Sequence, residues 1–233
     1  MTNIAGSTVL VTGANGGLGT QLVQQALQRG ARRVYASARR PHSWDNERVF
    51  PLELDVADAE SVARAAREAA DTTILINNAG ISSASPLLQS TLQEVRDIFE
   101  INVLGPLSMV QQFAPVLAAH GGGAVIDVHS ARSWLAGPGA YSASKAALWA
   151  LTNSLRLELA EQNTHVLGAH FAFADTAMTA RFSGIAKADP ADIARVIYDG
   201  LESGEIEVIA DDLSRKYKAE LSLPLREQYP QLR

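Results

Sequence analysis

The feature that most limits the possible folds is a repeated alternation of short apolar runs with longer helical stretches. The runs TVLVT (8–12), TTILIN (72–77) and GAVIDVH (123–129) show little alternation between polar and apolar residues. Strands of this kind are buried on both faces, as in a parallel sheet covered by helices. The repeated strand–helix order therefore predicts an α/β fold, a doubly wound parallel sheet of about seven strands with helices on both faces.

The other segments repeat this order. Further strands are predicted at 33–37, 48–54, 164–173 and 205–210, and helices at 17–30, 58–70, 92–120, 140–160 and 190–203, the third helix being broken at Gly105-Pro106. No linker, low-complexity segment or charge run divides the chain, so residues 1–233 are predicted to form a single domain. Within it we expect a substrate lid at 175–190 and a loose or interface-docked tail at 222–233.

Composition excludes several classes of function. A net charge of −5 leaves no electrostatic footprint for nucleic acid, and the absence of cysteine excludes disulfides and thiolate catalysis. The first residues lack the pattern of a signal peptide, and no apolar run approaches the roughly 20 residues of a membrane span. We therefore expect no nucleic-acid or membrane partner and a cytoplasmic location.

A metal site is not expected either. Asp127 and His129 stand two residues apart on one face of a predicted strand, where two ligands could converge. No third ligand follows at a diagnostic spacing, and there is no cysteine to supply one. A histidine satisfied within the strand is the simpler interpretation.

A glycine-rich segment, TGANGGLG (12–19), falls where the first strand ends and the first helix begins. Gly13 permits the tight turn, Gly17 lets the backbone approach a pyrophosphate, and Gly19 allows close packing of helix on strand. The helix then presents free N–H groups and a partial positive charge to the phosphates. Three glycines alone are weak evidence, but their place between a strand and a helix favours nucleotide binding over a simple turn.

The end of the second strand indicates which dinucleotide binds. An acidic residue there would bind the ribose 2′-hydroxyl of NAD, but the segment VYASARRP (34–41) has none and offers Arg39 and Arg40. A 2′-phosphate suits two guanidinium groups, so NADP(H) is favoured and NAD(H) remains possible. Asp55, after the third strand, either reaches the adenine amino group or caps the helix that begins near Asp58.

Tyr141 and Lys145 stand four residues apart on an otherwise apolar helix, so their side chains share one face. A free tyrosine has a pKa of about 10, and lowering it toward 7 requires roughly 4 kcal/mol. One ammonium at about 4 Å, in an effective dielectric constant near 20, supplies an interaction of this size. The pair can therefore act as an acid–base group, although a lysine that reaches solvent beside an incidental tyrosine is the alternative.

Other polar residues stand where they could join this pair. Ser130 follows an apolar strand and could hydrogen-bond a substrate oxygen, with Ser133 as a rival for that role. The segment NNAG (77–80) ends another strand. Asn102 stands within a helix just before Gly105-Pro106, where an amide is unfavourable unless it has a partner.

These motifs, in this order, resemble the short-chain dehydrogenase/reductase family, from TGANGGLG through NNAG, Asn102 and Ser130 to Tyr141 and Lys145. The resemblance extends to about residue 180 and implies a single-domain Rossmann-type doubly wound sheet. It also implies hydride transfer between NAD(P)H and a carbonyl or alcohol.

The resemblance further implies a role for each matching residue. Tyr141 is then the general acid in reduction and the base in oxidation, Lys145 lowers the pKa of Tyr141 and contacts the nicotinamide ribose, and Ser130 polarises the substrate oxygen. Asn102 would hold a water in a proton relay through Lys145. The residues implied in cofactor binding are Gly13, Asn15, Gly16, Gly17, Leu18, Gly19, Arg39, Arg40, Asp55, Val56, Asn78, Ala79, Gly80, Tyr141, Lys145 and Thr176.

The expected function is thus an NAD(P)-dependent oxidoreductase acting on a small-to-medium carbonyl or alcohol. The alternatives are a catalytically silent NAD(P)-binding sensor and another chemistry on the same scaffold. In the lid, Met178, Phe182 and Ile185 are the apolar residues, and Trp134 is a further candidate for the substrate pocket. Leucine-rich faces in 92–120 and 146–159 suggest a homodimer or homotetramer.

Overall fold

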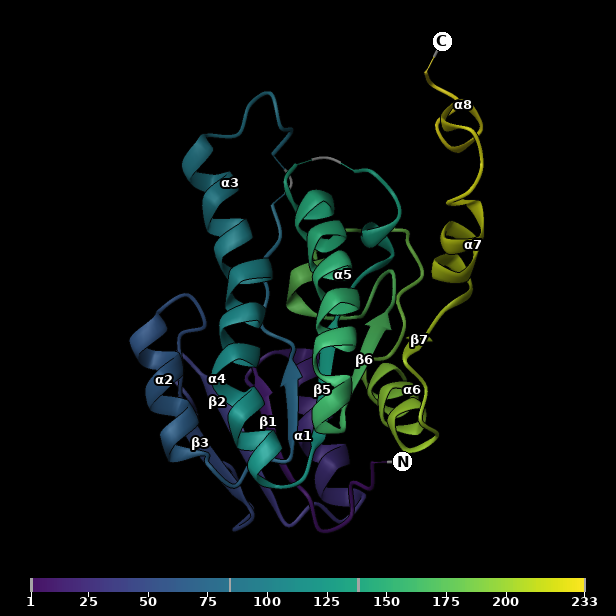
Figure 1. Cartoon of the computed structure of the whole chain (residues 1–233). Coiled ribbons are helices and arrows are strands. Elements are labelled where there is room, and N and C mark those ends of the chain that lie inside the picture. Colours follow the sequence, from purple (N-terminus) through teal and green to yellow (C-terminus); the bar gives the residue numbers. More distant parts are fainter. Residues whose placement is uncertain (1, 84, 138, 233) are drawn as a thin grey trace.

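The computed structural model describes residues 2–83, 85–137 and 139–232. Within them a parallel sheet of seven strands runs in the spatial order β3-β2-β1-β4-β5-β6-β7 (Figure 1). The strands are β1 (Thr8–Thr12), β2 (Arg33–Ala38), β3 (Val49–Glu53), β4 (Ile74–Asn77), β5 (Gly123–Val128), β6 (Thr164–His170) and β7 (Glu207–Ile209). The direction of strand addition reverses between β1 and β4, so the sheet is doubly wound and the predicted fold class is confirmed.

Helices cover both faces of the sheet. In chain order, the α-helices of the described residues are α1 (Gly17–Gln28), α2 (Ala59–Glu68), α3 (Leu92–Phe99), α4 (Gly105–Ala119), α5 (Tyr141–Glu158), α6 (Pro190–Glu202), α7 (Asp212–Glu220) and α8 (Leu225–Gln228). Leu22 of α1 and Ile197 of α6 join the core on one face. Phe113 of α4 and Leu155 of α5 join a second core on the other face, together with residues of α2.

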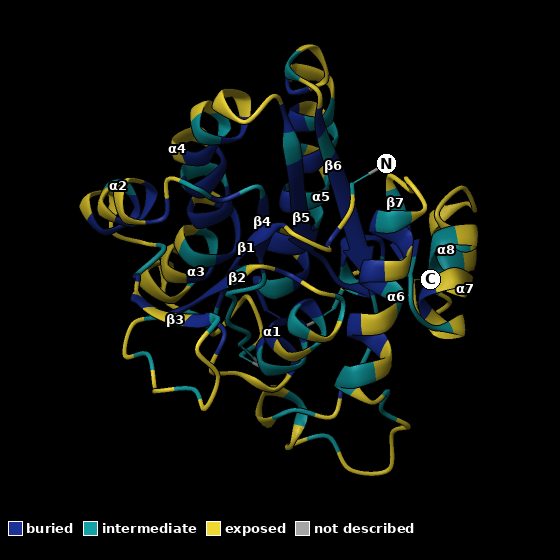
Figure 2. Cartoon of the chain, turned by 90° about the horizontal axis from the view of Figure 1, so that it is seen from below, coloured by how far each residue is buried: buried dark blue, intermediate teal, exposed yellow. Residues whose placement is uncertain are grey.

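The sheet lies in the middle of the molecule. Every residue of β1 and β4 is buried, and Figure 2 shows the strands as a dark band surrounded by more exposed helices and loops. Burial on both faces explains why these segments contain apolar residues without alternation. Because all strands are parallel, their carboxyl ends meet at one edge, where the loops after β1, β4, β5 and β6 converge.

The long helical stretch before β5 differs from the prediction. Gly105-Pro106 does not break it: Pro106 lies in the first turn of α4, and the chain is helical on both sides of it. Instead a π-helix, Glu100–Leu104, joins α3 to α4. By length and composition alone, the helical segment Leu92–Ala119 could cross a membrane, although the sequence predicted no membrane span. Of its most apolar stretch, 44% is buried inside the protein.

The carboxyl-terminal segment contains structure that the hydrophobic pattern did not predict. After β7, Asp211 caps α7 by accepting a hydrogen bond from the Ser214 N–H. The short helix α8 lies within the expected tail, and the Ala136 N–H donates to the Tyr229 hydroxyl at 2.9 Å. The chain end thereby packs beside the loop that follows β5.

Candidate active site

Two adjoining hollows open at the carboxyl edge of the sheet. The first, of about 350 Å³, is lined by the glycine turn, the loops after β4 and β5, the start of α5 and residues 171–182. The second is lined by the loops after β2 and β3. Residues common to both walls are Gly13, Gly16, Ala79 and Gly80. Each residue that the sequence assigns to cofactor binding lines at least one of these hollows.

The glycine turn has the shape of a phosphate cradle. Gly13 has a φ of +67°, and a Cβ on Gly19 would lie 2.3 Å from the Gly13 carbonyl oxygen, so neither position tolerates a side chain easily. Helix α1 begins at Gly17 with no side-chain cap and no acidic residue in its first turn. Its first N–H groups therefore remain available to an anion.

Thr176 lies across this turn, because a Cβ on Gly17 would approach its Cγ2 to 2.9 Å. The methyl group of Thr176 therefore packs beside the backbone of Gly17. The free amides of the turn fit a dinucleotide pyrophosphate.

The second hollow carries the features expected around an adenosine ribose. Arg39 and Arg40 are exposed on its rim, and Asn15 Nδ2 donates to the Arg40 carbonyl at 2.8 Å. Within the described residues neither guanidinium pairs with a carboxylate. Asp58, not Asp55, caps α2, so Asp55 remains in the wall of the hollow.

The NNAG segment connects the glycine turn to the rest of the site. The backbone N–H groups of Asn78 and Ala79 both donate to the Thr12 hydroxyl at 2.9 Å, and Asn78 Nδ2 donates to the Thr12 carbonyl at 2.8 Å. These bonds join the ends of β1 and β4. They fix the two loops that border both hollows.

Asn102 lies on the π-helix, fully buried. Its Nδ2 donates to the Ile81 carbonyl at 2.9 Å and to the Ser144 hydroxyl at 3.0 Å, and its Oδ1 accepts the Ile81 N–H at 2.9 Å. Ser144 in turn donates to the Tyr141 carbonyl at 2.7 Å. Asn102 thus joins the β4 loop to the first turn of α5. Ser144 had no signal in the sequence, because a serine within a helix is uninformative by itself.

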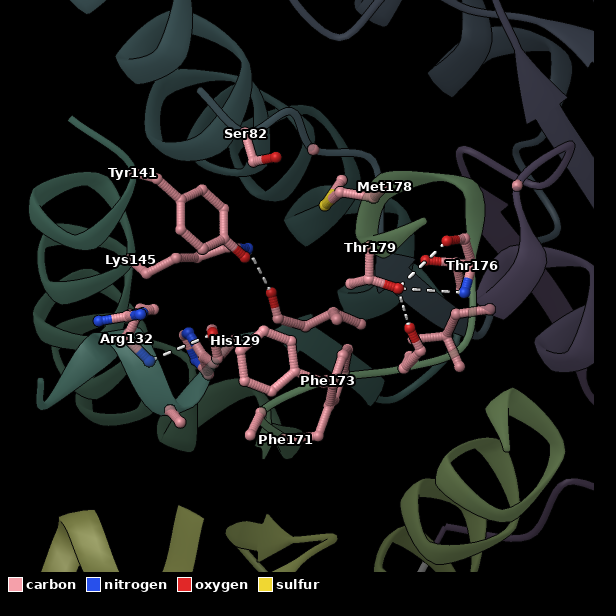
Figure 3. Close-up of a pocket in the computed structure, with 18 of the residues that line it drawn as sticks. Ser82, His129, Arg132, Tyr141, Lys145, Phe171, Phe173, Thr176, Met178 and Thr179 are labelled. Carbon is pink, nitrogen blue, oxygen red and sulfur yellow. Dashed lines mark hydrogen bonds between the residues drawn. The ribbon is translucent and has the colours of Figure 1, made fainter. Parts of the chain in front are cut away.

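Lys145 is buried against β5. Its Nζ donates to the Val128 carbonyl at 2.8 Å and lies 5.9 Å from the centroid of the Tyr141 ring. Burial lowers the pKa of Lys145 to about 8, although the charge of Asp127 acts in the opposite direction. Figure 3 shows Tyr141 and Lys145 together on one wall of the first hollow.

Burial also dominates the pKa of Tyr141, which is raised. A hydrogen bond with Ser130 and the charge of Arg132 oppose this increase. The sequence suggested that Lys145 lowers the pKa of Tyr141. In the protein without cofactor this effect is absent, because the Lys145 ammonium binds the Val128 carbonyl instead. Ser130 lines the hollow, whereas Ser133 is absent from its wall, and the buried Ser133 hydroxyl has no hydrogen-bond partner among the residues that the structure describes. The geometry favours Ser130.

A polar network lies beneath the active site. Asp127 is fully buried and accepts hydrogen bonds from Asn77 Nδ2 at 2.9 Å and from the Thr152 hydroxyl at 2.6 Å. Lys145 and Thr152, two turns apart on α5, thus bind consecutive residues of β5. Burial raises the pKa of Asp127, while these hydrogen bonds and the charge of Lys145 oppose that shift. Among the described residues no cluster of metal ligands forms around it.

An aromatic stack lies beside Ser130. The rings of His129 and His170 are 4.5 Å apart, and those of His170 and Trp134 are 4.1 Å apart, with small interplanar angles. Trp149 meets Trp134 edge to face at 6.1 Å. Burial lowers the pKa of His170 to about 3. Trp134 therefore packs behind the hollow and is not part of its wall, contrary to its assignment as a pocket candidate.

The segment after β6 forms one side of the first hollow. Met178 and Phe182 line it, as does Tyr217 of α7, whereas Ile185 does not. Figure 3 places Met178 and Ser82 across from Tyr141 and Lys145, with Phe171 and Phe173 below. Ser82, Arg132, Arg181 and Tyr217 are lining residues that sequence reasoning missed, since they carry no motif.

Comparisons with known proteins agree with this arrangement. The family model of short chain dehydrogenases matches residues 7–184. A short-chain dehydrogenase of Penicillium crustosum is 38% identical over 175 residues, which cover 69% of this chain and 63% of that relative. The match thus spans less than two thirds of that relative's length.

Two further proteins match nearly the whole chain. The NADP-dependent 3-hydroxy acid dehydrogenase of Schizosaccharomyces pombe is 30% identical over 242 residues, covering 91% of this chain and 93% of the relative. The crystal structure of a short chain dehydrogenase from Burkholderia cenocepacia in complex with NADP has a TM-score of 0.91 at 35% identity, covering 99% of both chains. The chain therefore belongs to the short-chain dehydrogenase/reductase family.

Proposed function

We propose that this oxidoreductase is an NADPH-dependent reductase of a small-to-medium carbonyl compound, with the reverse oxidation of an alcohol as its other direction. The observation that carries the proposal is the meeting of Ser130, Tyr141 and Lys145 at one wall of a hollow whose opposite end is the glycine turn. The relative from Schizosaccharomyces pombe is named as NADP-dependent, and the structure from Burkholderia cenocepacia contains NADP.

Residues of this chain fit each part of the cofactor. The free amides of α1 would hold the pyrophosphate, Arg39 and Arg40 the 2′-phosphate, and Lys145 the nicotinamide ribose, with Thr176 in the wall beside them. When bound, the cofactor supplies or accepts the hydride. The protein's contribution is to place the substrate carbon beside it and to manage the proton.

Tyr141 supplies that proton in reduction. Its raised pKa keeps the phenol protonated near neutral pH, which is the form that a general acid requires. Ser130, which lines the hollow beside Tyr141, donates to the same substrate oxygen and stabilises the charge that develops there. For the reverse reaction the phenol must lose its proton, and this requires the Lys145 ammonium to act on Tyr141 in place of the Val128 carbonyl.

Asn102 acts as a positioning residue. Both of its side-chain N–H groups are engaged, one by Ile81 and one by Ser144, so the amide holds the β4 loop against α5. A water molecule in the proton relay would therefore have to bind a group other than these two N–H donors. The relay through Lys145 stays a prediction.

The test compares the wild type with Tyr141→Phe, using NADPH oxidation on a panel of ketones and aldehydes. Loss of general acid catalysis is expected to reduce kcat by roughly 10²- to 10⁴-fold while NADPH still binds. Tyr35→Phe is the matched control. It removes a phenol hydroxyl from β2, which β1 and β4 separate from β5, and it should leave turnover unchanged. Tight NADPH binding with no turnover by the wild type would instead support the sensor alternative.

We further propose a homo-oligomer formed through α4 and α5. Leu104, the last residue of the π-helix before α4, and Leu157, near the end of α5, are 47% and 79% exposed, and a partner surface would cover them. Light scattering at several concentrations tests this, and a monomer at all of them would contradict it.

A further inference from the structure

The hollow beside Tyr141 is positively charged, although the chain as a whole carries a net charge of −5. The described residues of its wall include Arg132, Lys145 and Arg181 but no aspartate or glutamate. Arginines elsewhere pair with acids, for example Arg29 with Asp199 and Glu202. Within the described residues, neither Arg132 nor Arg181 has a carboxylate within ion-pair distance. Among these residues, the guanidinium charges of Arg132 and Arg181 are therefore not neutralised by an ion pair.

Arg181 spans the mouth of the hollow. It follows the short helical turn Ala177–Thr179, and its Nη2 lies 3.4 Å from the hydroxyl of Ser82 in the β4 loop. Its guanidinium also lies 5.0 Å from the centroid of the Phe182 ring. One long contact to a hydroxyl leaves most of its five N–H groups unused. A guanidinium in this state is well suited to a second, anionic partner.

Arg132 lies on the other side, two residues after Ser130. Its Nη1 donates to the Ala136 carbonyl at 2.9 Å, and its guanidinium packs on Gly137, where a Cβ would come within 2.4 Å of Nη1. A backbone carbonyl orients this cation without neutralising it. Its charge is felt at the reacting phenol, because it acts to lower the pKa of Tyr141.

The rest of the wall combines apolar side chains with side chains that carry hydroxyl groups. The apolar ones include Leu135, Phe171, Phe173, Met178 and Phe182, and the hydroxyl groups include those of Ser82 and Ser142. The apolar side chains would contact an apolar body of the substrate. Arg181 is exposed to solvent beside them, where an incoming anion can reach it.

Resting on the proposed function, we propose that the substrate is a carbonyl compound with an apolar body and an anionic group, a carboxylate or a phosphate. Arg181 binds this group at the mouth of the hollow, while Ser130 and Tyr141 hold the carbonyl oxygen. Arg132 adds positive potential between the two. Arg181 is thus a specificity-determining residue for the reaction.

The experiment compares each anionic ketone with a neutral counterpart. The carboxylate pair is 4-oxopentanoate and its ethyl ester, and the phosphate pair is the phosphate monoester of 5-hydroxypentan-2-one and 5-hydroxypentan-2-one itself. For the wild type we expect kcat/KM with NADPH to favour the anion in at least one pair, and the pair with the larger ratio identifies the anion. Arg181→Met should reduce kcat/KM for that anion about tenfold or more and change the neutral partner less than about threefold.

Arg67→Met, an exposed arginine of α2, is the matched control and should leave both values unchanged. Arg181→Lys should recover part of the preference, because the charge remains while the planar fork is lost. A wild type that prefers the neutral ketones, or an Arg181→Met variant that loses activity on both members equally, would overturn the proposal. So would a weaker affinity for NADPH with an unchanged substrate ratio, since Arg181 would then bind the cofactor.

A calorimetric titration separates this proposal from the proposed function. The two anions are titrated into the wild type and into Arg181→Met, each saturated with NADP⁺. If no ketone is reduced, the proposed function fails, but binding of an anion that is lost in Arg181→Met would still support the anion site. Absence of binding, or equal binding by both proteins, would contradict it.

Discussion

Folding buries the Lys145 side chain almost completely, with 6% of the residue exposed, and lowers its pKa from 10.5 to about 8. Between these two pH values the unfolded chain binds more protons than the folded one, so the stability due to this group rises with pH. Below about pH 8 the unfavourable contribution is complete. At about 1.4 kcal/mol per pH unit, it amounts to roughly 3 kcal/mol of lost stability near pH 7.

Lys145→Met removes the titrating amine and keeps the aliphatic stem. The variant also loses the hydrogen bond to the Val128 carbonyl, which contributes about 1 kcal/mol. We therefore expect the variant to be more stable than the wild type by roughly 2 kcal/mol near pH 7 while it is catalytically impaired. This advantage should fall by about 2 kcal/mol on going to about pH 9.5, because the wild-type lysine is then largely neutral in the folded state.

Urea unfolding of the cofactor-free proteins, followed by far-ultraviolet circular dichroism at both pH values, measures these differences. Other titrating groups are common to both proteins and cancel in the comparison. Lys216→Met, at an exposed lysine of α7, is the control for replacing a lysine as such. Parallel pH dependences for the wild type and Lys145→Met would refute the reasoning, as would a wild type that loses stability relative to the variant as the pH rises.

Three further predictions concern the cofactor cradle and the polar network. Gly19→Ala should abolish NADPH binding in a fluorescence titration, because its Cβ would lie 2.3 Å from a backbone oxygen that has no room to move; near-normal affinity would contradict the assigned turn. Replacing both Arg39 and Arg40 by alanine should weaken NADPH about tenfold or more and leave NADH unchanged, whereas equal effects on the two cofactors would remove these residues from the 2′-phosphate site. Asp127→Asn removes a charge that raises the pKa of Lys145, so the alkaline limb of the profile of kcat/KM against pH should move to lower pH. An unchanged alkaline limb would show that Asp127 does not influence the titration of Lys145.

Much of the fold followed from local patterns. Strands that are buried on both faces consist largely of apolar residues, so their sequences identify them. The turn between β1 and α1 is recognisable because only glycine readily adopts the backbone conformation that it requires. The helix α7 was not predicted, because DLSRKYKAE contains few apolar residues and, of its residues, only Ser214 is fully buried. The break expected at Gly105-Pro106 was wrong, because the π-helix Glu100–Leu104 leads from α3 directly into α4 and the helical backbone continues through the proline.

The site was predictable only where a single segment defines it. Tyr141 and Lys145 share one helix face, so their proximity followed from spacing. The partner of Lys145 is a backbone carbonyl, which every residue possesses and no motif marks. Asp127 illustrates the same limit, since its partners Asn77 and Thr152 are 50 and 25 residues away and converge only through the sheet. Arg181 meets Ser82 across 99 residues, beyond any local pattern.

The aromatic stack behind Ser130 also gives the protein an intrinsic optical probe. Trp134 and Trp149 lie edge to face beside the loop that borders the hollow, while the remaining tryptophan, Trp44, stacks on His42 in a separate loop. Reduced nicotinamide absorbs light in the range where tryptophan emits, and oxidised nicotinamide does not. Excitation energy from the indole pair would therefore pass to a bound reduced cofactor and cease to do so after hydride transfer. A single turnover could be followed in the emission of the unlabelled chain.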